Sequence, residues 1–251
     1  MSQSVVAGSP SFAEPRTYRL EVVGVRDLTP RMRRIQLTDP SLSEFTCLPG
    51  QDVALVFSRD HGTAVRRRYT IRHFDQQRRL LELDFVMHGD GPGMRWAQAA
   101  GPGVSIETIG PRGKITLVLN VRWHLFAGDA TAVPGSLAMM EALPTDVPAR
   151  AFLQVDDAAE IQQLERSKGR GVEWRFETGE PGHPDGVVAA LEEADLPDEG
   201  HAYLAGEVGL VQALKNVLLA RGWTPEQISA KAYWNRGRAN AGHGEPEIKA
   251  S

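Results

Sequence analysis

The stretch Arg66-Arg67-Arg68-Tyr69-Thr70-Ile71-Arg72 places an aromatic ring and a hydroxyl among four arginines. Alternate side chains of an extended strand share a face, so Arg67 and Tyr69 can contact the same molecule. A guanidinium binds phosphate and a tyrosine ring packs on flat conjugated systems, which predicts a planar, phosphorylated ligand. An arginine-rich edge strand that avoids pairing would have the same sequence, so both interpretations stay open for this stretch alone.

A glycine-rich turn follows the next expected strand, at 80–87. The turn reads His88-Gly89-Asp90-Gly91-Pro92-Gly93-Met94 and leads into a short expected helix. Glycines let a ligand approach the backbone closely, and the N–H groups of a first helical turn attract anions. The junction therefore suits a pyrophosphate group, although an ordinary turn would use the same residue types.

The chain changes character near residue 120. Before it, short strands separated by glycine and proline are expected at 18–25, 32–38, 53–57, 67–73, 80–87, 104–108 and 115–119, which predicts an antiparallel β-barrel. After it, strands at 123–127, 150–155, 173–177, 201–205 and 228–234 alternate with helices at 132–142, 158–166, 185–194 and 208–221. This alternation predicts an α/β domain with a parallel sheet. We expect a barrel domain at 16–120, an α/β domain at 121–238, and flexible tails at 1–15 and 239–251.

Two strand-to-helix junctions in the second part suit a nucleotide. At the first, Gly128-Asp129-Ala130-Thr131 ends a strand, and Thr131 can cap the helix that follows. At the second, Ala205-Gly206-Glu207 repeats this arrangement. Nucleotides bind at the carboxyl edge of open α/β sheets, so both junctions fit the diphosphate of a nicotinamide cofactor. A plain, well-capped helix explains the same residues.

Composition excludes several classes of function. The 28 basic and 32 acidic residues give a net charge of −4, which offers no overall attraction to nucleic acid or to an anionic membrane. The single cysteine, Cys47, excludes an internal disulfide, an iron–sulfur cluster and a four-cysteine zinc site, and the histidines show no metal-ligand spacing. No metal site is therefore expected, and an organic cofactor must carry any electrons. Without a long apolar run or an export signal at 1–15, we expect a cytoplasmic protein with no membrane insertion.

The motifs, taken in order, resemble those of the siderophore-interacting protein family, a branch of the ferredoxin-reductase-like flavoproteins. The resemblance spans about 16–237. It is carried by Arg67-x-Tyr69-Thr70-x-Arg72, Asp84-Phe85-Val86-x-His88-Gly89-Asp90-Gly91-Pro92, Trp96-Ala97, Gly110-Pro111-x-Gly113, 127–135, 203–207 and 231–237. It implies that the barrel binds FAD and that the α/β domain binds NADH or NADPH.

The resemblance also implies roles for the residues around the flavin. Arg67 would pair with a flavin phosphate, and Arg72 would help to fix the ring or a phosphate. Tyr69 would lie against the isoalloxazine ring and Thr70 would hydrogen-bond near its N5 atom, which makes these two the expected catalytic residues. Five residues would surround the pyrophosphate, which favours FAD over FMN: His88, Asp90, Gly91, Gly93 and Met94.

A second set of residues would hold the nicotinamide cofactor in the cleft between the two domains. These are Gly128, Asp129, Thr131, Ala205, Gly206 and Glu207. The chain departs from the family at two places. Ala130 stands where many relatives have glutamate, and Gly93-Met94 stands where they often have a small residue followed by serine. The second change removes a hydroxyl that could bind phosphate.

The activity implied is the reduction of a ferric siderophore. Electrons from NADH or NADPH, with ferredoxin as an alternative donor, would pass through FAD to the iron, because a flavin links two-electron and one-electron chemistry. Ferrous iron binds hard oxygen ligands less tightly, so reduction would release it. An anionic ferric chelate predicts a basic acceptor pocket, for which the candidates are Arg59, Lys231, Arg236 and Arg238. Each of these could equally be a solvated surface charge.

Three points stay open on sequence alone. Asp156-Asp157 follows a strand of the second part and favours NADH over NADPH, although Arg150, Arg166 or Arg175 could reverse that preference. The natural acceptor could be another small molecule or a protein, which would make the chain a general flavin reductase. Ala130 and Met94 would also suit a carrier that binds ferric chelates without turnover.

Overall fold

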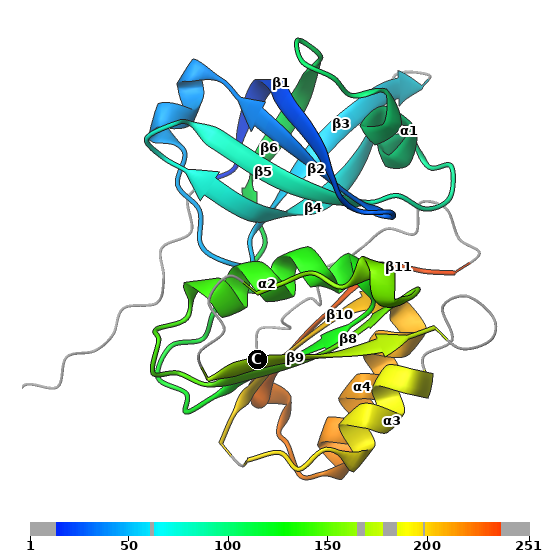
Figure 1. Cartoon of the computed structure of the whole chain (residues 1–251). Coiled ribbons are helices and arrows are strands. Elements are labelled where there is room, and N and C mark those ends of the chain that lie inside the picture. The colour runs from blue at the N-terminus through cyan, green and yellow to red at the C-terminus, as the bar shows by residue number, and fades with distance from the viewer. Residues whose placement is uncertain (1–13, 61–62, 165–168, 178–184, 198, 237–251) are drawn as a thin grey trace, which may run out of the picture.

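The structure is a computed structural model that describes residues 14–60, 63–164, 169–177, 185–197 and 199–236. Figure 1 shows a barrel stacked on an α/β domain, with helix α2 lying between them. The barrel strands are β1 (Arg16–Thr29), β2 (Met32–Thr38), β3 (Asp52–Asp60), β4 (Thr63–Asp75), β5 (Leu80–Val86) and β6 (Ser105–Arg112). A short helix, α1 (Pro92–Ala99), and a 3-10 turn, Pro40–Glu44, complete this part.

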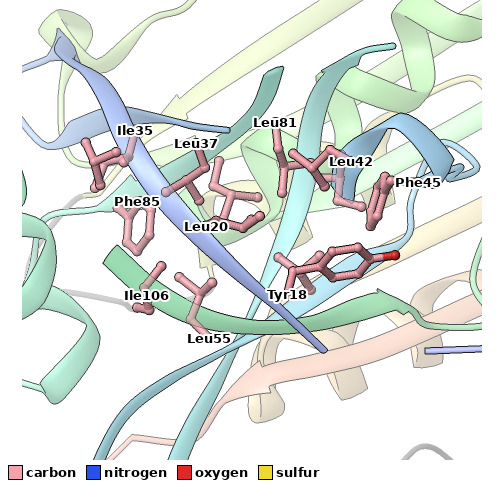
Figure 2. Close-up of a cluster of buried hydrophobic side chains, with 14 of the residues drawn as sticks. Tyr18, Leu20, Ile35, Leu37, Leu42, Phe45, Leu55, Leu81, Phe85 and Ile106 are labelled. Atoms are coloured by element: carbon pink, nitrogen blue, oxygen red, sulfur yellow. The ribbon is translucent and has the colours of Figure 1, made fainter. Parts of the chain in front are cut away.

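The barrel closes on itself in the order β1-β2-β5-β4-β3-β6, with β6 pairing back onto β1. Neighbouring strands are antiparallel, as the spacing of polar and apolar residues predicts. Side chains that alternate along the strands fill the interior, among them Leu20, Leu37, Leu55 and Phe85, all at most 1% exposed (Figure 2). The predicted antiparallel barrel is confirmed.

The second domain is a five-stranded parallel sheet in the order β11-β10-β7-β8-β9. Its strands are β7 (His124–Gly128), β8 (Ala149–Val155), β9 (Arg170–Phe176), β10 (His201–Glu207) and β11 (Ile228–Trp234). Helices α3 (Asp185–Glu193) and α4 (Val208–Ala220) cover one face, and α2 (Val133–Ala142) covers the face towards the barrel (Figure 1). Residues 133–140 of α2 are all buried because the helix packs on the sheet below and on the barrel above. The predicted α/β domain is confirmed.

The strand expected at 115–119 is absent, and the chain there is an irregular connection between the domains. Every strand of a closed barrel already has two neighbours, so no edge remains for a seventh. The apolar side chains of Ile115 and Leu117 instead pack under α2, and the Val118 N–H donates a hydrogen bond to Tyr203 Oη at 2.7 Å. The apolar run at 115–119 therefore indicated side chains that pack against the core, and not a β-strand.

The helix expected at 158–166 was also wrong, because only a 3-10 turn, Ala158–Glu160, forms there. Ile161 already has extended backbone angles, and residues 165–166 lie outside the described part of the chain. The Glu160 carboxylate accepts hydrogen bonds from Thr29 Oγ1 and from the Arg31 N–H of the barrel. This contact between the domains replaces the helix. Most of the two expected tails also lies outside the described residues.

Candidate functional site

Two neighbouring cavities lie where the barrel meets the α/β domain. The first has a volume of about 330 Å³ and is enclosed by β4, the glycine-rich turn, the starts of α1 and α2, and β11. The second has a volume of about 140 Å³ and lies at the carboxyl edge of the sheet. Nine of the predicted site residues line the first cavity: Arg67, Tyr69, Thr70, His88, Gly91, Gly93, Met94, Thr131 and Lys231.

The Tyr69 ring forms part of the aromatic wall of the first cavity. Its centroid lies 4.2 Å from that of Phe85 and 6.3 Å from that of Phe57, so the ring is held against the barrel core. Burial raises the pKa of the Tyr69 phenol, and the nearby Arg67 opposes this only in part. The hydroxyl faces the glycine-rich turn, where a Cβ added to Gly93 would lie 1.9 Å from it. Only glycine fits at position 93 unless the ring moves.

The glycine-rich turn presents backbone donors to the cavity. Helix α1 begins after Gly91 without a side-chain cap, and Pro92 occupies its first turn. The N–H groups of Gly93 and Met94 therefore have no partner within the helix, since the first turn of an α-helix leaves its donors unpaired. Gly89 has a φ of +66°, and a Cβ added there or at Gly91 would meet no atom within 4 Å. The turn thus leaves open space beside free N–H groups, which is the geometry that a pyrophosphate requires.

A polar wall with groups from both domains closes one side of the cavity. The Asp52 carboxylate accepts a hydrogen bond from Arg68 Nε at 2.8 Å and another from Lys231 Nζ at 2.8 Å. The side chains of Asp52 and Lys231 are only 5% and 13% exposed. The sequence predicted Lys231 in a basic acceptor pocket near the flavin and gave no role to Asp52, which stands in no recognisable motif. Both residues line the first cavity.

Thr70 meets the second domain at Tyr233. Their hydroxyl oxygens are 3.5 Å apart, and a Cβ added to Gly135 of α2 would lie 3.3 Å from Thr70 Cγ2. Burial raises the pKa of Tyr233, and the contact with Thr70 opposes the rise. Thr70 is therefore fixed between β11 and α2 while it still lines the cavity. Tyr233 and Trp234, which were part of the motif but had no assigned role, line the cavity as well.

Arg72 and Asp90 are not among the residues that line either cavity. The Arg72 guanidinium binds both oxygens of Glu141 on α2, at 2.6 and 2.9 Å, and its side chain is 8% exposed. This buried ion pair holds the barrel to the second domain, and the expected contact of Arg72 with the flavin ring or a phosphate stays a prediction. The Asp90 carbonyl accepts a hydrogen bond from Arg95 Nη1.

Asp129 lines the second cavity and joins three strand ends there. Its carboxylate accepts hydrogen bonds from the Thr131 N–H at 2.8 Å, the Glu207 N–H at 2.7 Å and the Trp234 Nε1–H at 2.9 Å. Gly206 has a φ of +137°, which side chains rarely adopt, and a Cβ there would also lie 2.6 Å from this carboxylate. Asp129 is thus a structural centre of the edge as well as a wall of the cavity.

The other residues expected to hold the nicotinamide cofactor pack behind that wall. A Cβ on Gly128 would lie 2.0 Å from the Ala205 carbonyl oxygen, so this glycine permits two strands to approach closely. The Glu207 carboxylate caps α4 by accepting hydrogen bonds from the N–H groups of Gly209 and Leu210. None of Gly128, Ala205, Gly206 and Glu207 lines either cavity.

Of the remaining candidates, Arg236 is the one whose side chain the structure describes, and it lines neither cavity. Arg236 is exposed, and its N–H donates to Glu207 Oε1 at 3.3 Å. The Arg59 side chain and all of Arg238 lie outside the described residues. Asp156 lines the second cavity but already pairs with Arg31 of the barrel.

The first cavity fits FAD by its chemistry. The Tyr69 ring supplies a flat apolar wall, the turn from Gly89 to Met94 supplies free N–H groups, and Arg67 supplies a cation for phosphate. The second cavity adjoins it, since His88, Thr131 and Trp234 line both. A second ligand there would lie next to the first.

Comparisons with known proteins agree with this geometry. Residues 58–115 match the family described as "Siderophore-interacting FAD-binding domain", and residues 121–237 match "Siderophore-interacting protein". The chain is 34% identical over 184 residues to the ferric vibriobactin reductase ViuB of Vibrio cholerae, across 69% of this chain and 66% of that protein. It is 27% identical to the NADPH-dependent ferric-chelate reductase of Escherichia coli, across 64% of this chain and 63% of that protein. The chain thus spans just under two thirds of each of these relatives.

A solved structure matches over a larger share. A siderophore utilization protein from T. fusca superimposes with a TM-score of 0.85 and 30% identity, over 93% of this chain and 98% of that one.

Proposed function

The chain belongs to the siderophore-interacting protein family, and we propose that it is an FAD-dependent ferric-siderophore reductase. In this proposal electrons pass from NADH or NADPH through FAD to a ferric siderophore, which then releases ferrous iron. The observation that supports it most is the first cavity, which brings Tyr69, Thr70 and the glycine-rich turn around one space between the domains. Ferric reductase is also the named activity of two relatives.

The residues of the barrel would bind and orient the cofactor. Bound FAD supplies the chemistry that converts a two-electron donation into one-electron deliveries. Tyr69, held by Phe85, would support one face of the flavin ring, and the N–H groups of Gly93 and Met94 would bind the pyrophosphate. Met94 has no hydroxyl to add, so backbone donors and Arg67 would provide most of the phosphate contacts.

Thr70 would act at the redox edge of the ring. Its hydroxyl lies 3.5 Å from that of Tyr233, and its methyl group lies next to Gly135 of α2. A hydroxyl held in this way can donate a hydrogen bond without reorganising, which costs less than ordering a mobile group. Thr70 and Tyr69 are therefore the residues that we propose for contact with the reacting ring.

The second cavity would receive the nicotinamide end of NADH or NADPH. It lies at the carboxyl edge of a parallel sheet, where nucleotides bind in such folds, and it shares Trp234 with the first cavity. Its acidic residues include Asp129, Asp156 and Glu177, and Arg31 is the one arginine or lysine among the described residues that line it. This lining fits the ribose hydroxyl of NADH better than the 2′-phosphate of NADPH. Arg31 is the side chain that would bind that phosphate if NADPH were the donor.

The acceptor site is proposed on charge alone. A ferric chelate with several oxygen anions would favour basic side chains near the flavin, and Arg59, Arg236 and Arg238 remain the candidates. Arg236 is exposed and close in sequence to the cavity residues Tyr233 and Trp234. Ferredoxin as an electron donor also remains a proposal.

The test is a reductive and an oxidative half-reaction on the purified, FAD-loaded protein. We expect the yellow colour to bleach with NADH or NADPH under anaerobic conditions and to return on addition of a ferric siderophore, with ferrous iron trapped by a coloured chelator. Rapid recovery with quinones or ferredoxin, and none with ferric chelates, would indicate a general flavin reductase. Binding of a ferric chelate by a protein that takes up no FAD would indicate a carrier.

A further inference from the structure

The ion pair between Lys231 and Asp52 joins the two domains directly at the first cavity. The residues are 179 positions apart, on β11 and β3, and both line the cavity. A nearly buried ion pair contributes little net stability, because the loss of hydration offsets the attraction between the charges. The pair is therefore better explained by its electrostatic effect on a molecule in the cavity than by a contribution to folding stability.

Two cations bind the same carboxylate at this pair. The single Asp52 carboxylate binds two cations, Lys231 and Arg68. The other acidic residue of the lining, Asp84, already binds Arg34 Nε at 2.7 Å and Arg34 Nη2 at 2.8 Å. The carboxylate that binds Lys231 thus also binds a second cation, Arg68.

We infer that Lys231 stabilises the reduced form of the bound flavin and that the negative charge of Asp52, which binds the Lys231 ammonium, partly offsets this effect. The inference rests on the proposed function, since it requires FAD in the first cavity. Reduction adds two electrons and one proton to give the anionic reduced flavin, so the ring gains one negative charge. A fixed cation in a water-poor site favours that charge and makes the flavin easier to reduce.

The second domain therefore contributes to the redox chemistry as well as to binding the donor. Lys231 approaches from β11, and its Nζ lies 5.8 Å from the centroid of the Tyr233 ring, which also faces the cavity. The ammonium is held from two sides, by the Asp52 carboxylate and by this ring. A cation held so closely needs no reorganisation when the charge on the flavin changes.

The test compares the reduction potential of bound FAD in two variants with opposite charge changes. Lys231→Met removes a positive charge and should make the flavin harder to reduce, whereas Asp52→Asn removes a negative charge and should make it easier. A unit charge within about 5 Å of the ring would change the ratio of the affinities for reduced and oxidised FAD by about tenfold or more. The potential is read by equilibration with a reference dye during slow anaerobic reduction of the full chain.

Controls separate the electrostatic role from a structural one. The double variant Asp52→Asn with Lys231→Met restores the wild-type charge balance, so its potential should return towards the wild-type value. Lys215→Met on α4 makes the same chemical change outside both cavities and should leave the potential unchanged. A purely structural pair would lower the melting temperature in both single variants and shift their potentials in the same direction or not at all.

Potentials that move together in Lys231→Met and Asp52→Asn would overturn this inference and leave the proposed function intact. A wild-type chain that binds no FAD would instead overturn the proposed function, and the inference with it. Should either single variant fail to fold, the double variant and its remaining partner still give the comparison, because their charges differ by one unit.

Discussion

Replacing Gly93 with alanine tests how the glycine-rich turn and the aromatic wall fit together. A Cβ at this position would lie 1.9 Å from Tyr69 Oη, 3.2 Å from Tyr69 Cζ and 3.4 Å from Phe57 Cζ. Ordinary contact requires about 3.4 Å, so the new methyl group and the hydroxyl must separate by about 1.5 Å. The Tyr69 ring has little room behind it, because Phe85 lies 4.2 Å away between centroids.

The ring must therefore move into the cavity, or the start of α1 must move away from it. Overpacking of this size costs about 1–3 kcal/mol, and either movement disturbs groups that we expect to contact FAD. If this cost falls on the bound state, FAD affinity drops about 5- to 150-fold. The assay is a titration of the apo-protein with FAD, followed by flavin fluorescence, together with urea unfolding of the apo-protein.

Two further alanine variants make the comparison specific. Gly101→Ala adds a methyl group that meets nothing within 4 Å and lies outside both cavities, so it should leave FAD affinity unchanged. Gly91→Ala also meets no protein atom, yet it lies in the cavity wall and should weaken FAD binding with little loss of apo stability. Wild-type affinity in both Gly91→Ala and Gly93→Ala would refute the assignment of the turn to the pyrophosphate.

Other predictions concern stability. Glu141→Gln leaves the buried Arg72 guanidinium without its main carboxylate and should lower the free energy of unfolding by about 3 kcal/mol in a urea titration. Glu44→Gln, at the exposed pair with Arg16, should change it little. Equal effects of the two variants would contradict the role of the Arg72 pair. Burial lowers the pKa of His124 to about 4, with His201 nearby adding to the effect, so the neutral form is favoured in the folded state. Stability should fall by about 3 kcal/mol as the pH drops from about 6.5 to about 4. In His124→Asn the unfolding midpoint should depend less on pH over that interval, and an unchanged dependence would argue against this cause.

Local patterns predicted the parts of the site that are continuous in sequence. Tyr69 and Thr70 lie in one strand, and the turn from Gly89 to Gly93 is a single segment whose glycines let a ligand approach the backbone. The kind of ligand that these residues bind can therefore be predicted without knowing the fold. The order of these motifs along the chain resembles that of a known family, which predicted FAD as the ligand. In the structure the strand and the turn line one cavity.

Residues that act through distant contacts could not be predicted in this way. No sequence rule distinguishes Arg72, which pairs with Glu141 across the domain junction, from Arg67, which lines the cavity. Asp52 is likewise an ordinary strand residue until β11 brings Lys231 to within 2.8 Å of it. Both outcomes depend on how two domains dock, which local periodicity does not encode.

The same limit explains the errors in secondary structure. The apolar run at 115–119 has the composition of a strand, but closure of the barrel leaves no edge to accept it. The run at 158–166 has helical periodicity, but the Glu160 carboxylate bonds the turn between β1 and β2 instead. In each case a contact with another element outweighed the local preference.

The central claim is that FAD binds in the first cavity, between the barrel and β11. Calorimetric titration of the apo-protein with FAD, and in parallel with FMN, tests it most directly. We predict saturable binding of one FAD per chain and at least about tenfold weaker binding of FMN, which lacks the pyrophosphate that the turn at Gly91–Met94 would hold. Absence of FAD binding, or equal affinity for the two flavins, would contradict the account.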